Sequence, residues 1–199
     1  MSSVVISGNT SGTITLDAPN VAGTTVLTLP TANGTVLTTA NVSSNLPAGS
    51  VLQVVQTVKT DTWSNATQNT WNDVTGLSVS ITPSSSSSKI LVIGNINYAA
   101  GSNLYYRIVR DSTAICVGDT ASSRISATGS SGYNHTDGNV GKTGAINYLD
   151  SPSTTSSVTY KVQIYGFNIT SYVNRVVTDT DSGVSARGAS TIIVMEIKG

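Results

Sequence analysis

The stretch VTYKVQIYG, residues 158–166, alternates apolar and polar side chains along its length. Tyr160, Val162 and Ile164 fall on one side of an extended chain, and the residues between them fall on the other. A period of two residues is typical of a β-strand with one buried face. The stretch therefore predicts a sheet that covers a hydrophobic core on one side only.

About ten strand-like runs follow one another from Ser50 onward, and none of comparable length has helical spacing. They are residues 51–59, 77–82, 89–98, 104–110, 114–118, 124–128, 143–149, 158–166, 172–177 and 191–198. Ser- and Pro-rich segments, such as 83–88 and 151–157, separate them as turns. Many short strands of this kind favour an all-β fold, an antiparallel jelly-roll-like β-sandwich, because two layers of strands can share one core.

The N-terminal region differs from the rest of the chain. Residues 1–58 contain one charged side chain, Asp17, and include the β-prone segments 13–16, 24–29 and 34–38. Such short segments bury little apolar surface alone and become stable by pairing with other strands. We therefore expect an extended N-terminal β-arm, residues 1–48, that docks on copies of itself or on a larger assembly, followed by a C-terminal domain, residues 49–199.

The composition limits the classes of function. Charged residues make up 10% of the chain, and 10 basic residues balance 10 acidic ones. The sequence therefore predicts no binding to nucleic acid and no attraction to an anionic membrane. A surface with so little charge lacks the self-repulsion that keeps monomers apart, which favours a permanent oligomer and a structural role.

Two further features concern compartment and redox chemistry. Cys116 is the single cysteine, so an intrachain disulfide is excluded, and its apolar neighbours predict a buried strand position. Residues 1–10 lack a secretory signal, and no apolar run reaches the roughly 20 residues that cross a bilayer. We expect synthesis in the cytoplasm, with no export and no membrane insertion.

The Gly-rich segment 129–139 contains the only histidine, His135, with Asp137 close by. A Ser-His-Asp site needs a histidine that a carboxylate holds in place, and a flexible loop holds this geometry poorly. We therefore expect a solvent-facing loop, in which Tyr133, Asn134 and His135 are candidates for contact with a ligand.

The two tryptophans, Trp63 and Trp71, flank the polar segment 64–70. Exposed aromatic rings beside amides are suited to stacking on a carbohydrate, and both residues are candidate glycan contacts. The alternative is that the rings are buried in the core or in a subunit interface, as is more common for aromatic side chains.

Carboxylates and arginines offer two weaker signals. Asp179 and Asp181 precede Gly183 as in part of a calcium loop, but the only glutamate is the distant Glu196, so a simple turn is favoured. No metal or cofactor is expected. In so charge-poor a chain, Arg–Asp pairs could set subunit register, or they could be ordinary surface pairs. The candidates are Arg107, Arg110, Arg124 and Arg175 with Asp111, Asp119, Asp150 and Asp179.

Two parts of the sequence resemble a known class of protein. Residues 11–37, SGTITLDAPNVAGTTVLTLPTANGTVL, resemble a module of tailed-bacteriophage virion proteins. Residues 106–119, 149–163, 174–175 and 192–197 resemble an all-β domain at the ends of phage fibres. The resemblance implies a homotrimer in a virion, with the arm bound to other virion proteins and the domain displayed toward the host, where it contacts a surface glycan. It identifies no binding residue.

The sequence accordingly predicts a non-enzymatic short tail fibre. A capsid cement or decoration protein is the alternative, because such proteins also join a β-rich arm to a trimeric knob and this chain has no long shaft. A polysaccharide-degrading tailspike needs paired carboxylates on a longer chain, and a secreted lectin or adhesin needs an export signal. Neither is visible in the sequence.

Overall fold

The computed structural model describes residues 3–7, 13–17, 42–132 and 140–199. The chain divides into two compact units, Met1–Thr39 and Ala40–Gly199. We call the second unit the knob. The division of functions predicted at residues 48 and 49 stays a prediction.

In the first unit, β1 (Ser3–Ser7) pairs antiparallel with β2 (Thr13–Asp17), with Ser3 opposite Asp17 and Ser7 opposite Thr13. The expected strand at 13–16 corresponds to β2, whereas β1 was not expected. The expected segments 24–29 and 34–38 lie outside the described residues.

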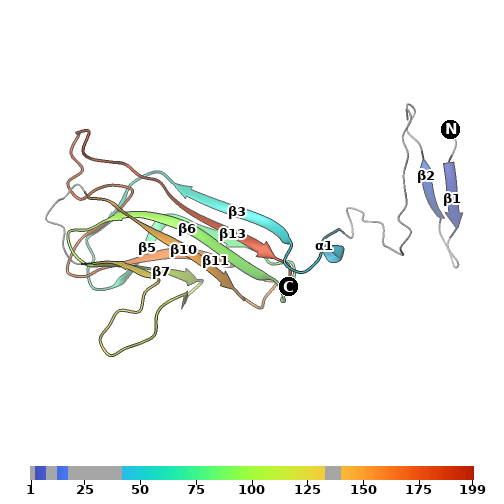
Figure 1. Ribbon diagram of the computed structural model, residues 1–199, viewed down its shortest axis with the longest axis horizontal. Helices are drawn as coiled ribbons and strands as arrows, with labels where there is room; N and C mark the ends of the chain where they lie inside the picture. The colour runs from blue at the N-terminus through green and yellow to red at the C-terminus, as the bar shows by residue number, and fades with distance from the viewer. Residues whose placement is uncertain (1–2, 8–12, 18–41, 133–139) are drawn as a thin grey trace. The chain divides into compact units, whose positions relative to one another are not determined.

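The knob begins with one helical turn, α1 (Val42–Asn45), and its other described elements are strands (Figure 1). They are β3 (Val51–Lys59), β4 (Trp63–Asn65), β5 (Trp71–Ile81), β6 (Lys89–Ala99), β7 (Leu104–Arg110), β8 (Thr113–Ile115), β9 (Gly129–Ser131), β10 (Lys142–Asp150), β11 (Val158–Gly166), β12 (Ser171–Val173) and β13 (Ser190–Ile197). Among the described residues, no helix is long and apolar enough to cross a membrane.

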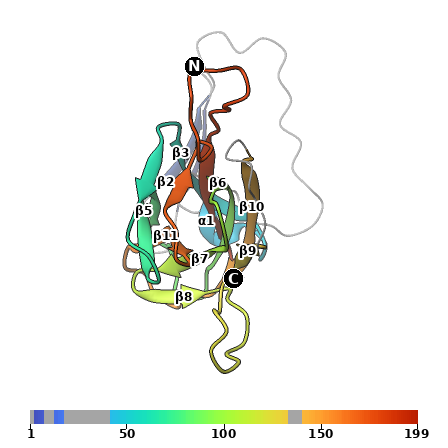
Figure 2. The same cartoon turned by 90° about the vertical axis from the view of Figure 1, so that its left-hand side faces the viewer.

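These strands form two antiparallel sheets that face each other (Figures 1 and 2). In the six-stranded sheet, β13 lies between β3 and β6, β10 pairs with the other edge of β6, and β12 and β4 extend the far end. In the five-stranded sheet, β11 lies between β5 and β7, and β8 and β9 both pair with β7.

Early strands pair with late ones in nested order: β3 with β13, β5 with β11, and β6 with β10. This is the winding of a jelly roll, in which a long antiparallel ribbon folds over into two layers. The expected fold class, an antiparallel jelly-roll-like β-sandwich, is confirmed.

The core lies between the two sheets and follows the alternation that the sequence predicts. Along β11, Tyr160, Val162 and Ile164 are fully buried, and the residues between them are partly exposed. The ring of Tyr106 packs over Gly129 and Gly144, where an added Cβ would lie 2.3 Å and 2.6 Å from its atoms. These two positions have room only for glycine because the ring occupies the space of a side chain.

Several strand boundaries differ from the expected ones, and backbone conformation accounts for two of them. β8 ends at Ile115 because Cys116 has a φ of 52°, and β12 ends at Val173 because Asn174 has a φ of 59°. The expected burial of Cys116 in a strand is therefore wrong, since this residue follows β8 and packs, partly buried, against the core. β5 begins earlier than expected, at Trp71, and β4 was not expected.

Residues 124–128 do not form the expected strand. Ser122, with a φ of 53°, lies in a turn in which Arg124 N donates to Ala121 O at 3.1 Å. The chain rejoins the sheet as β9, which begins at Gly129.

Candidate functional site

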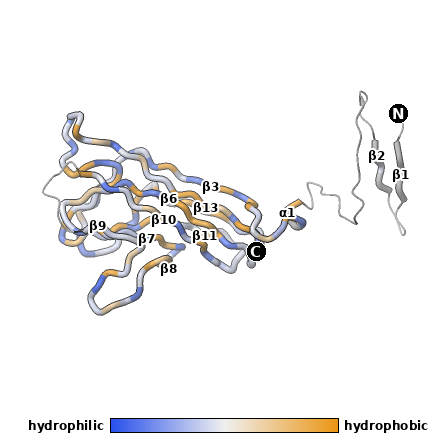
Figure 3. The backbone as a smooth tube through the Cα atoms, in the orientation of Figure 1, coloured by the Kyte–Doolittle hydropathy of each residue, from blue (hydrophilic) through white to orange (hydrophobic). Residues whose placement is uncertain are grey.

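The six-stranded sheet carries apolar side chains on its outer face as well as on its inner one. On β13, Ile192 and Val194 are buried in the core, so Ile193 and Met195 lie on the opposite face. The same alternation holds along β6, and apolar residues recur along β3, β13 and β6 (Figure 3). Apolar residues on both faces of one sheet predict that a second surface covers the outer face.

Strand register aligns these outward side chains in rows across β3, β13, β6 and β10. One row contains Val54, Met195, Leu91 and Leu149 as directly paired neighbours. The next row contains Gln56, Ile193, Ile93 and Asn147, and the third contains Val58, Thr191, Asn95 and Ala145. We call the large apolar members of these rows the apolar outer face: Val54, Val58, Leu91, Ile93, Leu149, Ile193 and Met195.

The apolar outer face is open to solvent in the isolated chain. Val54 is 56% exposed, Val58 51% and Leu149 46%. Isolated exposed apolar residues are common on protein surfaces, but an apolar row that continues across four strands, with further apolar residues beside it, is typical of an interaction site.

The outer face of the five-stranded sheet is polar by comparison. Asp73 accepts hydrogen bonds from Lys161 Nζ at 2.7 Å and from Gln163 Nε2 at 2.6 Å, and Arg107 Nε donates to Gln163 Oε1 at 2.8 Å. Burial raises the pKa of Asp73, but the bonds from Lys161 and Gln163 outweigh it and hold this pKa below its usual value. This face has internal partners for its polar groups, so it does not need a second chain to cover it.

A pocket of about 240 Å³ opens at the end of the six-stranded sheet opposite α1 (Figure 1). Its walls come from the ends of β6 and β10 and from the segment between β12 and β13. The lining residues are Asn97, Tyr98, Gly141, Lys142, Thr143, Asn174, Arg175, Val176, Ala186, Arg187 and Gly188. We call it the basic pocket, because Lys142, Arg175 and Arg187 are the charged residues in this lining.

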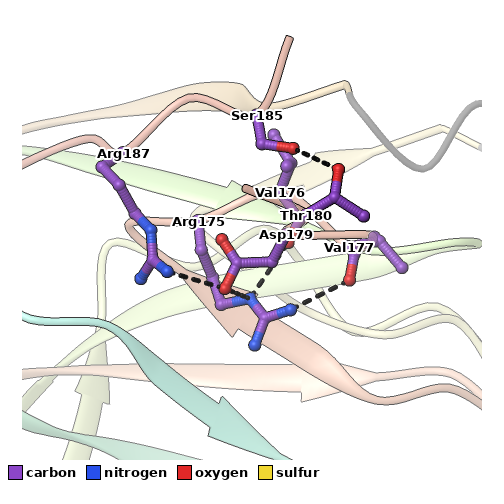
Figure 4. A network of polar contacts seen from close by, with 7 residues as sticks. All are labelled: Arg175, Val176, Val177, Asp179, Thr180, Ser185 and Arg187. Carbon is purple, nitrogen blue, oxygen red and sulfur yellow. Dashed lines mark hydrogen bonds and ion pairs between the residues drawn. The ribbon is translucent and has the colours of Figure 1, made fainter. Parts of the chain in front are cut away.

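The two arginines of the basic pocket are held together by one carboxylate. Arg175 and Arg187 face each other across an isolated antiparallel β-bridge, and Asp179 Oδ2 lies 3.3 Å from Arg175 Nε and 2.9 Å from Arg187 Nη2 (Figure 4). Arg175 also donates to the carbonyl oxygens of Val176 and Val177, both at 3.0 Å. Contacts within the chain therefore fix the positions of both arginine side chains in the absence of a ligand.

The candidate glycan contacts fall in different places. Trp63 lies in β4 of the six-stranded sheet and packs, partly buried, against the core. Trp71 is the first residue of β5 in the five-stranded sheet. The Arg107 guanidinium carbon lies 4.1 Å from the centre of the Trp71 ring, and the Trp71 and Tyr165 rings pack edge to face with 5.5 Å between their centres. Tyr133, Asn134 and His135, together with Asp137, lie outside the described residues. The expectation of a glycan site at these residues stays a prediction.

The expected Arg–Asp pairs form within the chain in two cases, Arg110 with Asp150 and Arg175 with Asp179. Asp179 engages two arginines, and in the described part of the chain no group of three or more His, Cys, Asp or Glu side chains is placed to bind a metal. Lys142 and Arg187 carry no signal in the sequence, because no motif links them and only the fold brings both to the lining of one pocket.

Buried ionisable groups elsewhere in the knob have structural partners. Asp150 accepts two bonds from Arg110 Nη1, at 2.8 Å and 2.9 Å, and one from the Tyr160 hydroxyl at 2.7 Å. Burial raises the pKa of Tyr160, and its hydrogen bond to the Asp150 carboxylate raises it further. This tyrosine therefore stays protonated and acts as a permanent donor inside the core.

Comparison with known proteins identifies no family. No family model matches the chain, and no curated protein matches its sequence. Among solved structures, a chain in the structure of infectious bursal disease virus, Gt strain, aligns at 13% identity with a TM-score of 0.40. The alignment covers 96% of this chain and 45% of that one, so this chain spans less than half the length of that protein. What the described residues define is a class, an all-β jelly-roll protein with an apolar sheet face and a basic pocket.

Proposed function

We propose that this chain is a non-enzymatic structural protein of a virion, a homotrimeric short tail fibre. In this proposal the knobs associate through the apolar outer face, the N-terminal arm attaches to other virion proteins, and the far end of the knob contacts the host surface. The single observation that carries the proposal is the set of in-register apolar rows on the outside of the six-stranded sheet.

A second copy of the chain is the occupant that fits this face best. The rows span four strands about 4.8 Å apart and five residues of about 3.3 Å each, from Val54 to Val58 on β3, roughly 300 Å² in projection. One partner in a standard interface buries about 800 Å² of accessible surface, and accessible area exceeds projected area because side chains stand above the sheet. The face is therefore large enough to form the apolar centre of a subunit interface, with the polar residues around it as the rim.

The charge distribution supports self-association. The chain has no net charge, and none of the residues of the apolar outer face is charged, so identical faces do not repel one another. Around a threefold axis, the faces of the three knobs turn inward and share one apolar centre. Each valine or leucine that becomes fully buried there contributes about 1.5–3 kcal/mol.

Hydrogen bonds fix the residues at the start of the knob. Gly49 N donates to Lys198 O at 2.7 Å, Lys198 N donates to Ser50 O at 2.8 Å, and Lys198 Nζ donates to Leu46 O. These bonds hold the start of the knob to its last strand. Three arms that leave a trimer at fixed positions are well arranged to bind one attachment site together, which increases avidity.

The first test measures the mass of the purified chain by size-exclusion chromatography with light scattering. The wild-type protein should elute with a mass near three times 20.4 kDa. Met195→Glu places a carboxylate in the centre of the apolar outer face, where burial without a partner costs several kcal/mol, so this variant should be monomeric.

Ser80→Glu is the matched control, because Ser80 is exposed on β5 in the other sheet. This variant should remain trimeric. Circular dichroism should show the same β content in all three proteins. A monomeric wild-type chain, or a Met195→Glu variant that stays trimeric, would contradict the proposed interface.

The second test concerns the particle. Deletion of residues 1–40 should leave a folded trimer that no longer joins virions, and a deletion that unfolds the knob would refute the division of labour. Copy number in purified virions separates the two candidate roles, because a decoration protein follows the capsid lattice and a fibre is present in far fewer copies.

A further inference from the structure

We infer that the basic pocket is a binding site for one anionic sugar residue, whose carboxylate or phosphate group pairs with Arg187 and Lys142. This inference rests on the proposed function, since it names what the far end of the knob would recognise on the host. It follows from the charge, the size and the pre-set geometry of the pocket.

The local charge is the first argument. Lys142, Arg175 and Arg187 are three of the 10 basic residues of a chain without net charge, and they line one pocket. Among the described residues, Asp179 is the carboxylate that pairs with the two arginines, so the three cations keep an excess of positive charge. A chain that is neutral as a whole has no general attraction for polyanions, but this pocket attracts a single anionic group.

The free donors are the second argument. Arg187 is 58% exposed at its side chain, and in the described part of the structure its bond to Asp179 uses Nη2. Nε and Nη1 remain available to an incoming anion. The backbone of Lys142 belongs to the β10–β6 ladder, whereas its Nζ makes no hydrogen bond or ion pair with the residues that the structure describes. A guanidinium beside an ammonium can bind the oxygens of one carboxylate or phosphate.

Arg175 acts as a positioning residue in this site. Its guanidinium stacks on the Tyr172 ring, with 4.7 Å between the guanidinium carbon and the ring centre. It also pairs with Asp179 and donates to two carbonyl groups of its own segment (Figure 4). Since these contacts fix the segment that carries Arg187, little conformational entropy is lost when a ligand binds.

The size and the remaining lining favour a sugar over a bare ion. About 240 Å³ is below the usual range of pockets for drug-sized ligands, about 300–1,000 Å³, and suits one monosaccharide unit. Thr143 Oγ1 donates to Asn97 Oδ1 at 2.8 Å, and its lone pairs remain able to accept from a sugar hydroxyl. The pocket also lies at the end of the knob away from α1, where a long glycan could reach it (Figure 1).

The test uses the full-length protein and four small probes: glucuronate, glucose 6-phosphate, glucose and acetate. Isothermal titration at low ionic strength should show saturable binding of glucuronate or glucose 6-phosphate, at least tenfold tighter than glucose or acetate. Whichever of the first two binds tighter identifies the source of the negative charge. Added salt should weaken the binding, because part of the site is exposed.

Arg187→Gln and Lys142→Gln should each weaken binding of the preferred probe about tenfold, the equivalent of one lost ion pair in a partly buried site. Arg124→Gln is the matched control, since Arg124 is an exposed cation outside the pocket, and it should bind as the wild type does. All variants should keep the oligomeric mass of the wild type. This readout separates a failed pocket from a failed assembly proposal.

Three outcomes would overturn the inference. These are the absence of saturable binding for both anionic sugars, equal affinity for acetate and glucuronate, and an equal loss of binding in Arg124→Gln and Arg187→Gln. Equal affinity for acetate and glucuronate would mean that the pocket binds anions but does not recognise the sugar.

Discussion

Glu196 offers the sharpest test of how the knob is held together. This single glutamate lies on β13 with 1% of its surface exposed. Its Oε1 accepts from Ser84 N at 2.7 Å and Ser84 Oγ at 2.6 Å, and its Oε2 accepts from Gln53 Nε2 at 2.6 Å. The carboxylate therefore joins β3 and the turn before β6 to the last strand.

Glu196→Gln keeps the shape of the side chain and changes one acceptor oxygen into a donor. That donor would face Gln53 Nε2, and Gln53 cannot simply turn over because the same nitrogen donates to Thr82 O at 2.7 Å. One buried donor without an acceptor costs about 1–3 kcal/mol, and loss of charge from the other bonds costs about 1 kcal/mol more. We expect the free energy of unfolding to fall by about 2–4 kcal/mol at pH 7.

The pH dependence gives an independent check. Burial raises the pKa of Glu196, but the bonds from Ser84 and Gln53 outweigh it and hold that pKa below its usual 4.5. Since the folded pKa is the lower one, the carboxylate stabilises the fold fully above about pH 4.5, and this stability is lost as the pH falls through the folded pKa. The difference between wild type and Glu196→Gln should therefore shrink below about pH 4.5.

The assay is urea unfolding followed by tryptophan fluorescence at several pH values and one fixed protein concentration, because association shifts apparent stability. Asp119→Asn is the matched control, since Asp119 is exposed, and it should change stability by less than about 0.5 kcal/mol. A Glu196→Gln protein within about 0.5 kcal/mol of the wild type at pH 7, or a difference that stays constant down to low pH, would refute the reasoning.

Two further substitutions test the core. Gly144→Ala would place a Cβ 2.6 Å from the ring of Tyr106, so it should cost about 1–3 kcal/mol and lower Tm, whereas Gly118→Ala, with nothing within 4 Å, should leave Tm unchanged. Equal melting curves for the two variants would contradict the close packing of that ring. Tyr160→Phe removes the hydroxyl that donates to Asp150 at 2.7 Å, and it should lower the free energy of unfolding by about 1.5–3 kcal/mol in chemical denaturation. A variant as stable as the wild type would show that this buried bond contributes nothing.

The strands that alternate most clearly were the easiest to predict from the sequence. β3, β7 and β11 have the expected bounds. In β7 and β11, apolar residues of period two define a buried face. β4 has three residues and was missed, since so short a segment contains less than two periods of any pattern. The early end of β12 depends on the left-handed conformation of Asn174, which hydrogen bonds from its side chain to Lys59 O and Asp61 O stabilise.

The candidate sites were harder to predict from the sequence than the strands were. Trp63 and Trp71 are noticeable in the sequence because they are rare, but rarity says nothing about which sheet or face a residue occupies, and the fold places them in different sheets. Lys142 and Arg187 were not predicted as site residues, although they line the same pocket.

The sequence by itself determined that this chain is built of short antiparallel strands around one core, because alternation and turn residues are local properties. It also determined that the protein has almost no electrostatic repulsion, since charge can be counted without a structure. Only the tertiary structure decided that Val54, Met195, Leu91 and Leu149 form one row on the outer face and that Lys142 and Arg187 line the same pocket. Both groupings depend on the register between strands that are distant along the chain, and register is set by the packing of all the strands together.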